Sequence, residues 1–319
     1  MVQDGRPGSK NNRWVHRFAL VTAAATFVLV IAGGLVTSTG SGLAVPDWPT
    51  TFGHNMFLYP WSKMVGGILV EHGHRLIGAG IGLLTVTLAL WLWIADPRGW
   101  LRWLGVVALA LVIVQGVLGG LRVVWLDRTL AIVHAALAQA FFALIASVAF
   151  FTSREGHEAP WEIQAADTGR LRTLALLTTG VIYLQLIFGA ILRHTGMGIA
   201  LHLLFAGVVS IQIFSLAVWI LGRYADQPRL VRPVALLSTL LMLQLVVGVA
   251  AYLGKFTSLG GGLSFGHLVA LTTTHVATGA LMLATCLVLT LRVYRLSAPR
   301  VPAIGREFLP SHPAARSEA

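Results

Sequence analysis

Long apolar stretches alternate with short polar segments along the whole chain. Eight of these stretches are almost free of charge and approach or exceed the about 20 residues that a helix needs to cross a bilayer. We predict membrane-spanning helices at residues 17–37, 67–95, 103–121, 129–151, 173–192, 197–221, 233–253 and 266–291. The pattern therefore predicts an all-α integral membrane protein with eight transmembrane helices.

The composition agrees with this prediction. Of the 319 residues, 56% are hydrophobic and only 11% are charged, whereas about a quarter of a soluble domain is charged. An ordinary soluble domain is excluded. The net charge of +11 does not indicate nucleic acid, because its distribution follows membrane topology.

The basic residues predict the orientation of the chain. Seventeen Lys and Arg residues fall on the side of the two termini and five on the opposite side, with Arg75 left inside a helix. Cytoplasmic segments carry the Lys and Arg excess, so we expect both termini in the cytoplasm. The expected location is a bacterial plasma membrane, or the inner mitochondrial membrane if the source is eukaryotic.

An internal repeat divides the chain into two halves. Three odd-numbered spans contain a Gln followed four residues later by a Gly, at Gln115 and Gly119, Gln185 and Gly189, and Gln244 and Gly248. We predict two pseudo-symmetric four-helix bundles at 17–152 and 173–293, joined by a cytoplasmic linker at 153–172. Residues 1–16 form a cytoplasmic arm and 294–319 a disordered cytoplasmic tail. The alternative is that Gln and small residues are a common device for helix packing in lipid.

Four histidines point to metal chemistry. They lie one on each even-numbered span, at comparable depth: His74, His134, His202 and His275. A single histidine in a membrane helix is most often a packing or hydrogen-bonding residue, but four at one depth favour two bis-histidine clamps for heme iron. Cys286 is the only cysteine, which excludes a disulfide within the chain and a cysteine-held cluster.

Charge beside one histidine distinguishes the two clamps. In the sequence EHGHR, Glu71, His74 and Arg75 share one helix face. A charge at depth costs about 2.5 to 3.5 kcal/mol on insertion scales and indicates a functional site. Glu71 and Arg75 could instead only neutralise each other, but the corresponding positions around His202 are apolar. The N-terminal clamp therefore suits proton transfer or charge stabilisation on a substrate, and the C-terminal clamp suits electron transfer.

These residues resemble a known family. The resemblance rests on EHGHR at 71–75, TSTGSGLAVPDWPTTFG at 37–53, RHTG at 193–196, and His134, His202 and His275. Together they resemble heme A synthase, the membrane enzyme that converts heme O to heme A for cytochrome oxidase, over about residues 17–293. Many members have a cysteine pair in the first external loop. This chain has none there, which places it with the cysteine-free subgroup.

The resemblance implies roles for the site residues. Heme O or heme A would occupy the N-terminal half, with His74 and His134 as iron ligands, Arg75 at the same site and Glu71 as the catalytic residue. Heme b would occupy the C-terminal half, with His202 and His275 as ligands. The family chemistry is two hydroxylations of a heme methyl group and loss of water to give a formyl group. Either His74 or His134 leaves the iron, or electrons leave the macrocycle and water traps the cation; the sequence does not choose.

Other functions and partners follow from the same residues. A di-heme b-type cytochrome that only transfers electrons, and a transporter whose histidines relay protons, are the two alternatives. The expected partners are the lipid bilayer, heme O synthase and an electron donor or acceptor that the sequence does not identify. Basic residues on the external side are expected to pair with heme propionates, against the alternative of solvated interfacial side chains: Arg122, Arg128, Arg193 and Lys255.

Overall fold

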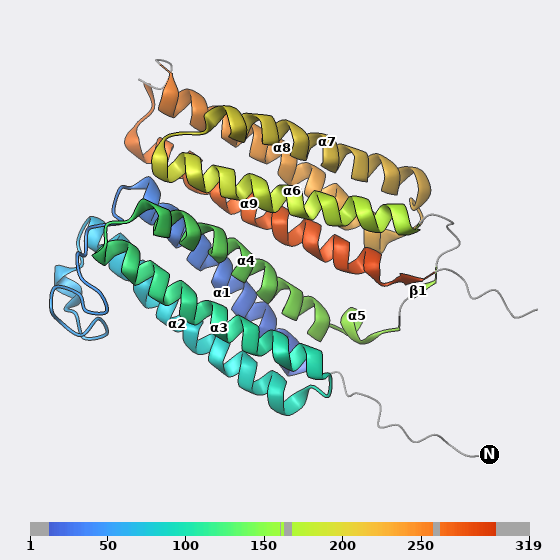
Figure 1. Ribbon diagram of the computed structural model, residues 1–319, viewed down its shortest axis with the longest axis horizontal. Coiled ribbons are helices and arrows are strands. Elements are labelled where there is room, and N and C mark those ends of the chain that lie inside the picture. Colours follow the sequence, from blue (N-terminus) through green and yellow to red (C-terminus); the bar gives the residue numbers. More distant parts are fainter. Residues whose placement is uncertain (1–12, 160, 163–167, 258–261, 298–319) are drawn as a thin grey trace, which may run out of the picture.

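The computed structural model consists of two groups of four long helices that lie side by side (Figure 1). It describes residues 13–159, 161–162, 168–257 and 262–297. The long helices are α1 (Arg13–Ser38), α2 (Gly67–Ala95), α3 (Gly99–Val124), α4 (Arg128–Thr152), α6 (Thr168–Thr195), α7 (Ile199–Arg223), α8 (Pro228–Phe256) and α9 (Phe265–Tyr294). All eight are long and apolar enough to cross a membrane. The predicted all-α, eight-span fold is confirmed, and the chain is a multi-pass membrane protein.

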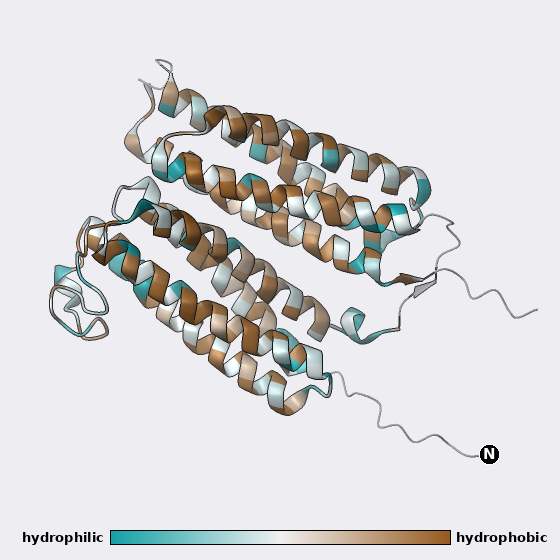
Figure 2. Cartoon of the chain, viewed as in Figure 1, coloured by the Kyte–Doolittle hydropathy of each residue, from teal (hydrophilic) through white to brown (hydrophobic). Residues whose placement is uncertain are grey.

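The distribution of hydropathy fits helices that cross a membrane. Apolar residues cover the lengths of the helices, and polar residues gather towards their ends and connections (Figure 2). Each half is a four-helix bundle with the same order of contacts: α1 to α2 to α3 to α4 and back to α1, and α6 to α7 to α8 to α9 and back to α6. The halves meet through α1 with α9, and through α4 with both α6 and α9. A two-fold relation between the halves stays a prediction.

The helix bounds agree with the predicted spans except at some ends. The span at 67–95 was predicted without error, whereas α8 begins at Pro228, five residues before the predicted start at Pro233. A proline inside a helix lacks the N–H that would bond the carbonyl of the residue four positions earlier. Here that carbonyl belongs to Arg229, and the guanidinium of Arg292 on α9 donates to it at 3.1 Å. A tertiary contact therefore compensates for the proline, which the sequence of the helix alone does not reveal.

A short polar hub joins the halves at the end where α1 begins and α9 ends (Figure 1). It contains α5 (Arg154–His157) and a two-residue parallel pairing of β1 (Trp161–Glu162) with β2 (Leu296–Ser297). The carboxylate of Glu155 accepts two hydrogen bonds from the side chain of Arg292. The predicted linker thus contains ordered elements, and so do the first residues of the predicted tail. The arm was predicted at 1–16, but its residues 13–16 belong to α1. Residues 1–12 of the arm and 298–319 of the predicted disordered tail lie outside the described residues.

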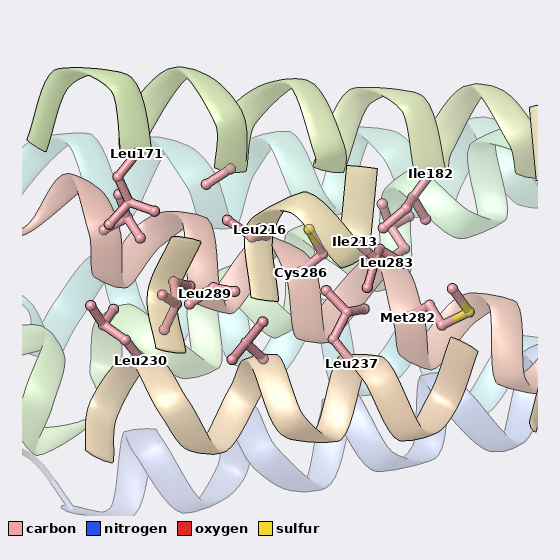
Figure 3. Packing of buried hydrophobic residues seen from close by; sticks show 14 of the residues in the cluster. Leu171, Ile182, Ile213, Leu216, Leu230, Leu237, Met282, Leu283, Cys286 and Leu289 are labelled. Carbon is pink, nitrogen blue, oxygen red and sulfur yellow. The ribbon is translucent and has the colours of Figure 1, made fainter. Parts of the chain in front are cut away.

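Apolar packing fills the part of each bundle nearer this hub. In the C-terminal half the buried cluster includes Leu171, Ile213, Leu237 and Leu289, with Cys286 at 0% exposure (Figure 3). In that half the Gln, Gly and His positions named above lie beyond this cluster, towards the opposite end. We call that opposite end of the two bundles the histidine end.

Candidate functional site

Each of the four histidines packs against a glycine of a neighbouring helix. A Cβ added to the glycine would lie close to the Cε1 of its histidine, at 3.2 Å for Gly33 and His74, 3.1 Å for Gly119 and His134, 3.3 Å for Gly189 and His202, and 2.8 Å for Gly248 and His275. The histidines are on α2, α4, α7 and α9, and the glycines on α1, α3, α6 and α8. Each imidazole therefore fits between the helices because the residue that it faces has no side chain.

Three of these histidines also contact the glutamine that precedes their glycine. With its amide nitrogen turned towards His134, Gln115 lies 3.0 Å from Nδ1 and 3.3 Å from the carbonyl oxygen of that residue. Gln185 contacts Nδ1 of His202 at 3.2 Å, and Gln244 contacts Nε2 of His275 at 3.3 Å. Which group donates depends on the imidazole tautomer and on the amide orientation. The Gln and Gly repeat thus builds the histidine sites, in addition to any role in helix packing.

The C-terminal pair fits a metal held between two imidazoles. The ring centroids of His202 and His275 are 6.2 Å apart, with an angle of 69° between the planes. A metal–nitrogen bond of about 2 Å on each side and about 1 Å from nitrogen to centroid give about 6 Å. Nδ1 of His275 is buried and has no hydrogen-bond partner in the described part of the chain, and Nε2 contacts Gln244.

The donor set also argues for heme over a bare ion. Within the described ranges, no group of three or more His, Cys, Asp or Glu residues is arranged so that it could hold a metal ion. A site with two protein ligands suits heme because the porphyrin supplies the remaining nitrogens. His74 and His134 provide the same donors on α2 and α4, and Nδ1 of His74 is buried without a partner among the described residues.

Glu71 and Arg75 form a buried ion pair that also holds the loop between α1 and α2 (residues 39–66). Arg75 Nη2 donates to Glu71 Oε1 at 2.8 Å, and Glu71 is 2% exposed. Glu71 Oε2 accepts from the N–H of Val45 at 2.9 Å. Arg75 donates to the carbonyl oxygens of Val45 at 2.9 Å and Asp47 at 2.7 Å. The prediction that Glu71 and Arg75 lie together is therefore confirmed. The pair also holds the loop, in addition to any catalytic role. The assignment of Arg75 to heme binding stays a prediction.

The same loop covers part of the N-terminal half. The indole of Trp48 lies against Gly120 of α3, so closely that a Cβ on Gly120 would be 2.1 Å from the ring. Gly120 is next to Gly119, which contacts His134. The loop therefore packs on α3 next to the glycine that contacts His134.

Asp47 organises the tip of the loop. Its carboxylate accepts from the N–H groups of Phe52 and Gly53 and from the hydroxyl of Thr50. Partial burial by itself raises the pKa of Asp47, but these hydrogen bonds outweigh it and lower the pKa from 3.8 to about 2. Asp47 is thus ionised, and the loop tip is fixed, at any physiological pH.

The four basic residues expected near propionates have different surroundings. Arg122 donates to the carbonyl oxygen of Gly42 at 2.8 Å. Arg193 donates at 2.6 Å to both the Gly34 carbonyl and the Ser38 hydroxyl of α1. Arg128 is exposed, and Lys255 lies over the ring of Phe256. Arg122 and Arg193 therefore already bind backbone of the N-terminal half, and propionate pairing by any of the four stays a prediction.

Sequence reasoning missed the partners that lie on other elements. Gly33 and the loop carbonyls bound by Arg75 carry no signal of their own in the sequence. Trp48 lies in the motif at 37–53, but its contact with Gly120 was not predicted. His72, which was not assigned as a ligand, contacts Thr51 at 3.0 Å and the ring of Tyr59, so it belongs to the loop contact. The Gln and Gly spacing was a visible signal, but it did not reveal that the glutamines contact the histidines.

The chain is similar to known proteins over about 60% of its length. The family described as cytochrome oxidase assembly protein matches residues 16–203, which include His74, His134 and His202 but not His275. Proteins named heme A synthase are 29% identical over 195 residues in Shouchella clausii and 28% over 191 residues in Geobacillus kaustophilus. The matched segments cover 59% and 57% of this chain and 62% and 57% of those relatives. The match spans more than half of the chain, so the chain belongs to the cytochrome oxidase assembly protein family.

Proposed function

We propose that this chain is a heme A synthase, an oxidoreductase that converts a methyl group of heme O to the formyl group of heme A. The observation that carries the proposal is the set of four imidazoles packed between helices, each against a glycine, with the buried carboxylate of Glu71 on the helix that carries His74. Relatives that bear the name heme A synthase support the same reaction. Two histidine pairs with different surroundings suit one substrate heme and one cofactor heme.

The N-terminal half would bind the substrate. His74 and His134 would hold the iron of heme O, and the loop at residues 39–66 would exclude bulk water through Trp48. Glu71 lies three residues before His74 on the same helix face, where a carboxylate can accept a proton or stabilise positive charge as the methyl group is oxidised. Arg75 would orient this carboxylate through the contact at 2.8 Å.

The C-terminal half would bind the cofactor. His202 and His275 would hold heme b, which supplies one-electron transfer when bound. Gln185 and Gln244 orient the two imidazoles by their contacts of 3.2 Å and 3.3 Å. The interior of this half, from Arg193 to the polar hub, is filled mostly by apolar side chains. Such surroundings suit a site that holds the iron without doing chemistry on the macrocycle.

Location and partners belong to the same proposal. We place the chain in a bacterial plasma membrane with both termini in the cytoplasm, since the basic residues gather on that side. The histidine end then faces outward. Heme O synthase would supply the substrate through the bilayer, and a separate redox partner would exchange electrons with heme b.

The test is a product assay in cells that make no other heme A. Membranes that express this chain together with a heme O synthase are extracted, and heme B, heme O, hydroxylated heme and heme A are separated. Heme A is expected from the unchanged chain and not from His74→Ala. Persistent heme O with two bound hemes would contradict the proposal and favour a di-heme electron-transfer cytochrome. A colourless protein from heme-replete cells would exclude both.

A further inference from the structure

The four histidine sites differ at one position of their supporting helix. Four residues before the contact glycine stands Gln115 on α3, Gln185 on α6 and Gln244 on α8. In α1 the glycine is Gly33, and the residue four positions earlier is Leu29. His74 is therefore the histidine whose supporting helix has no amide at this position.

Leu29 occupies the glutamine position in space as well as in sequence. The side chains of Gln115 and Gln244 also lie next to the residue four positions after the histidine that they contact. That residue therefore serves as a marker for the place of the glutamine. The Gln115 amide oxygen, in the orientation described above, accepts from the Ala138 N–H at 3.1 Å. The Gln244 amide nitrogen is 3.4 Å from a Cβ built on Gly279. For His74 the corresponding residue is Gly78, and a Cβ built there meets Leu29 at 4.0 Å. Leu29 thus replaces the amide with a methyl group.

The imidazole of His74 lacks the amide contact that the other three have. Its Nδ1 is buried and has no hydrogen-bond partner in the part of the chain that the structure describes; Nδ1 of His275 is also without a partner, but Gln244 contacts the other ring nitrogen of that residue at 3.3 Å. A histidine that holds a metal through one ring nitrogen ordinarily donates the N–H of the other to an oxygen, which fixes the ring and raises its basicity. Gln115 contacts Nδ1 of His134 at 3.0 Å through its amide, whereas Leu29 offers His74 no polar group.

We propose that His74 is the weakly held ligand of the N-terminal pair, and that Leu29 makes it so. This inference rests on the proposed function because it requires a heme iron between His74 and His134. Gln115 is then a positioning residue that keeps His134 bound while His74 gives way to an incoming ligand. The position that opens lies on the side of α2, the helix that also carries Glu71. Exchange breaks the bond from iron to His74 and forms one to the new ligand, with no change of oxidation state.

Carbon monoxide measures this exchange directly. The full chain is purified with both hemes, reduced, and mixed with carbon monoxide at saturating concentration. Iron with two imidazoles binds carbon monoxide only after one imidazole leaves, so the limiting rate reports its departure. The formyl group of heme A extends the conjugation of the macrocycle and shifts its absorption away from that of heme b, so each site is followed separately.

The decisive variant is Leu29→Gln, which supplies the missing amide. We expect the rate at the N-terminal heme to fall about 10-fold or more, in line with the usual effect of groups that support a metal ligand. Leu29→Met is the matched control, apolar and similar in size, and should keep the original rate. Gln115→Leu should raise the rate, because both imidazoles then lack support.

Two results would overturn the inference. One is an unchanged rate in Leu29→Gln with both hemes retained, and the other is no carbon monoxide binding at the N-terminal heme of the unchanged chain. Should Leu29→Gln fail to assemble, as seen by loss of heme b, an unchanged rate in Gln115→Leu would overturn it instead. Heme A extracted from the same preparations tests the proposed function separately, so heme A with an unchanged rate in Leu29→Gln refutes only the role of Leu29.

Discussion

The two halves place the same histidine and glycine contacts in different surroundings. In the N-terminal half, 28 residues separate α1 from α2, and the ion pair of Glu71 with Arg75 holds this loop against the bundle. In the C-terminal half, α6 and α7 are joined by Gly196–Gly198 alone, with φ of 74° at Gly196 and 84° at Gly198. Glycine is the residue that adopts such positive φ values without strain. The comparison shows that the contacts of the histidines are common to both halves, whereas the charged and loop-covered surroundings belong to one.

The largest expected effect comes from removing an imidazole. His202→Ala or His275→Ala should remove the heme b spectrum and leave the N-terminal site able to bind heme O, because the pairs lie in separate bundles. His74→Ala or His134→Ala should do the reverse. Extraction and quantification of hemes from purified protein provide the measurement. Full heme b in both C-terminal variants would show that these histidines are not its ligands.

Glu71→Gln should separate catalysis from loop support. The amide can still accept from the Val45 N–H but carries no charge, so we expect both hemes to remain while heme A formation falls about 100-fold or more. Heme O or the hydroxylated heme should accumulate. Arg75→Gln is the matched control, since it removes the same ion pair from the other side. Equal losses of heme and activity in both variants would mean that the pair only supports the loop, and normal heme A in Glu71→Gln would exclude a catalytic role.

Substitution of the contact glycines should act on one half at a time. Gly248→Ala places a methyl group 2.8 Å from His275 Cε1, so heme b affinity should fall about 10-fold to 100-fold. Gly120→Ala places one 2.1 Å from the Trp48 ring and should displace the loop without changing heme b content. Heme content and protease cleavage within residues 39–66 give the two measurements. Loss of heme b in Gly120→Ala would show that the halves do not load independently.

The smallest expected effect is the loosening of the loop tip around Asp47 at acidic pH. The pKa of Asp47 is lowered from 3.8 to about 2, so its contribution to stability is complete above pH 3.8 and is lost as the pH falls through about 2. Amide hydrogen exchange at Phe52 and Gly53 should therefore stay slow down to about pH 4 and become faster below it, after correction for intrinsic rates. Asp47→Ala should show the faster exchange at neutral pH. The C-terminal half provides the internal reference, and an equal response there would point to global unfolding.

Contacts between residues close in sequence could be predicted, whereas contacts between residues far apart in sequence could not. The eight spans and the i, i+4 pair of Glu71 with Arg75 follow from local patterns, and these were predicted correctly. The carbonyls of Val45 and Asp47 that Arg75 binds belong to a loop without periodicity, and the contact of Trp48 with Gly120 joins residues 72 positions apart. The start of α8 was misplaced for the same reason, because Arg292 on α9 supplies the bond that Pro233 cannot make. Long-range partners of this kind have no local signature.

The contact of Arg193 with α1 has a consequence for how the two sites fill. Arg193 donates to Gly34, the residue after the glycine that contacts His74, and to Ser38. Ser38 in turn bonds Thr272 and Thr273 on α9, the latter two residues before His275. Ser38 thus joins the α1 segment beside His74 to the α9 segment beside His275. For the proposed enzyme this connection implies a coupling free energy between the two sites, which by thermodynamic linkage acts equally in both directions. Such a coupling would change how tightly one site binds heme while the other is filled, and each site would still fill alone.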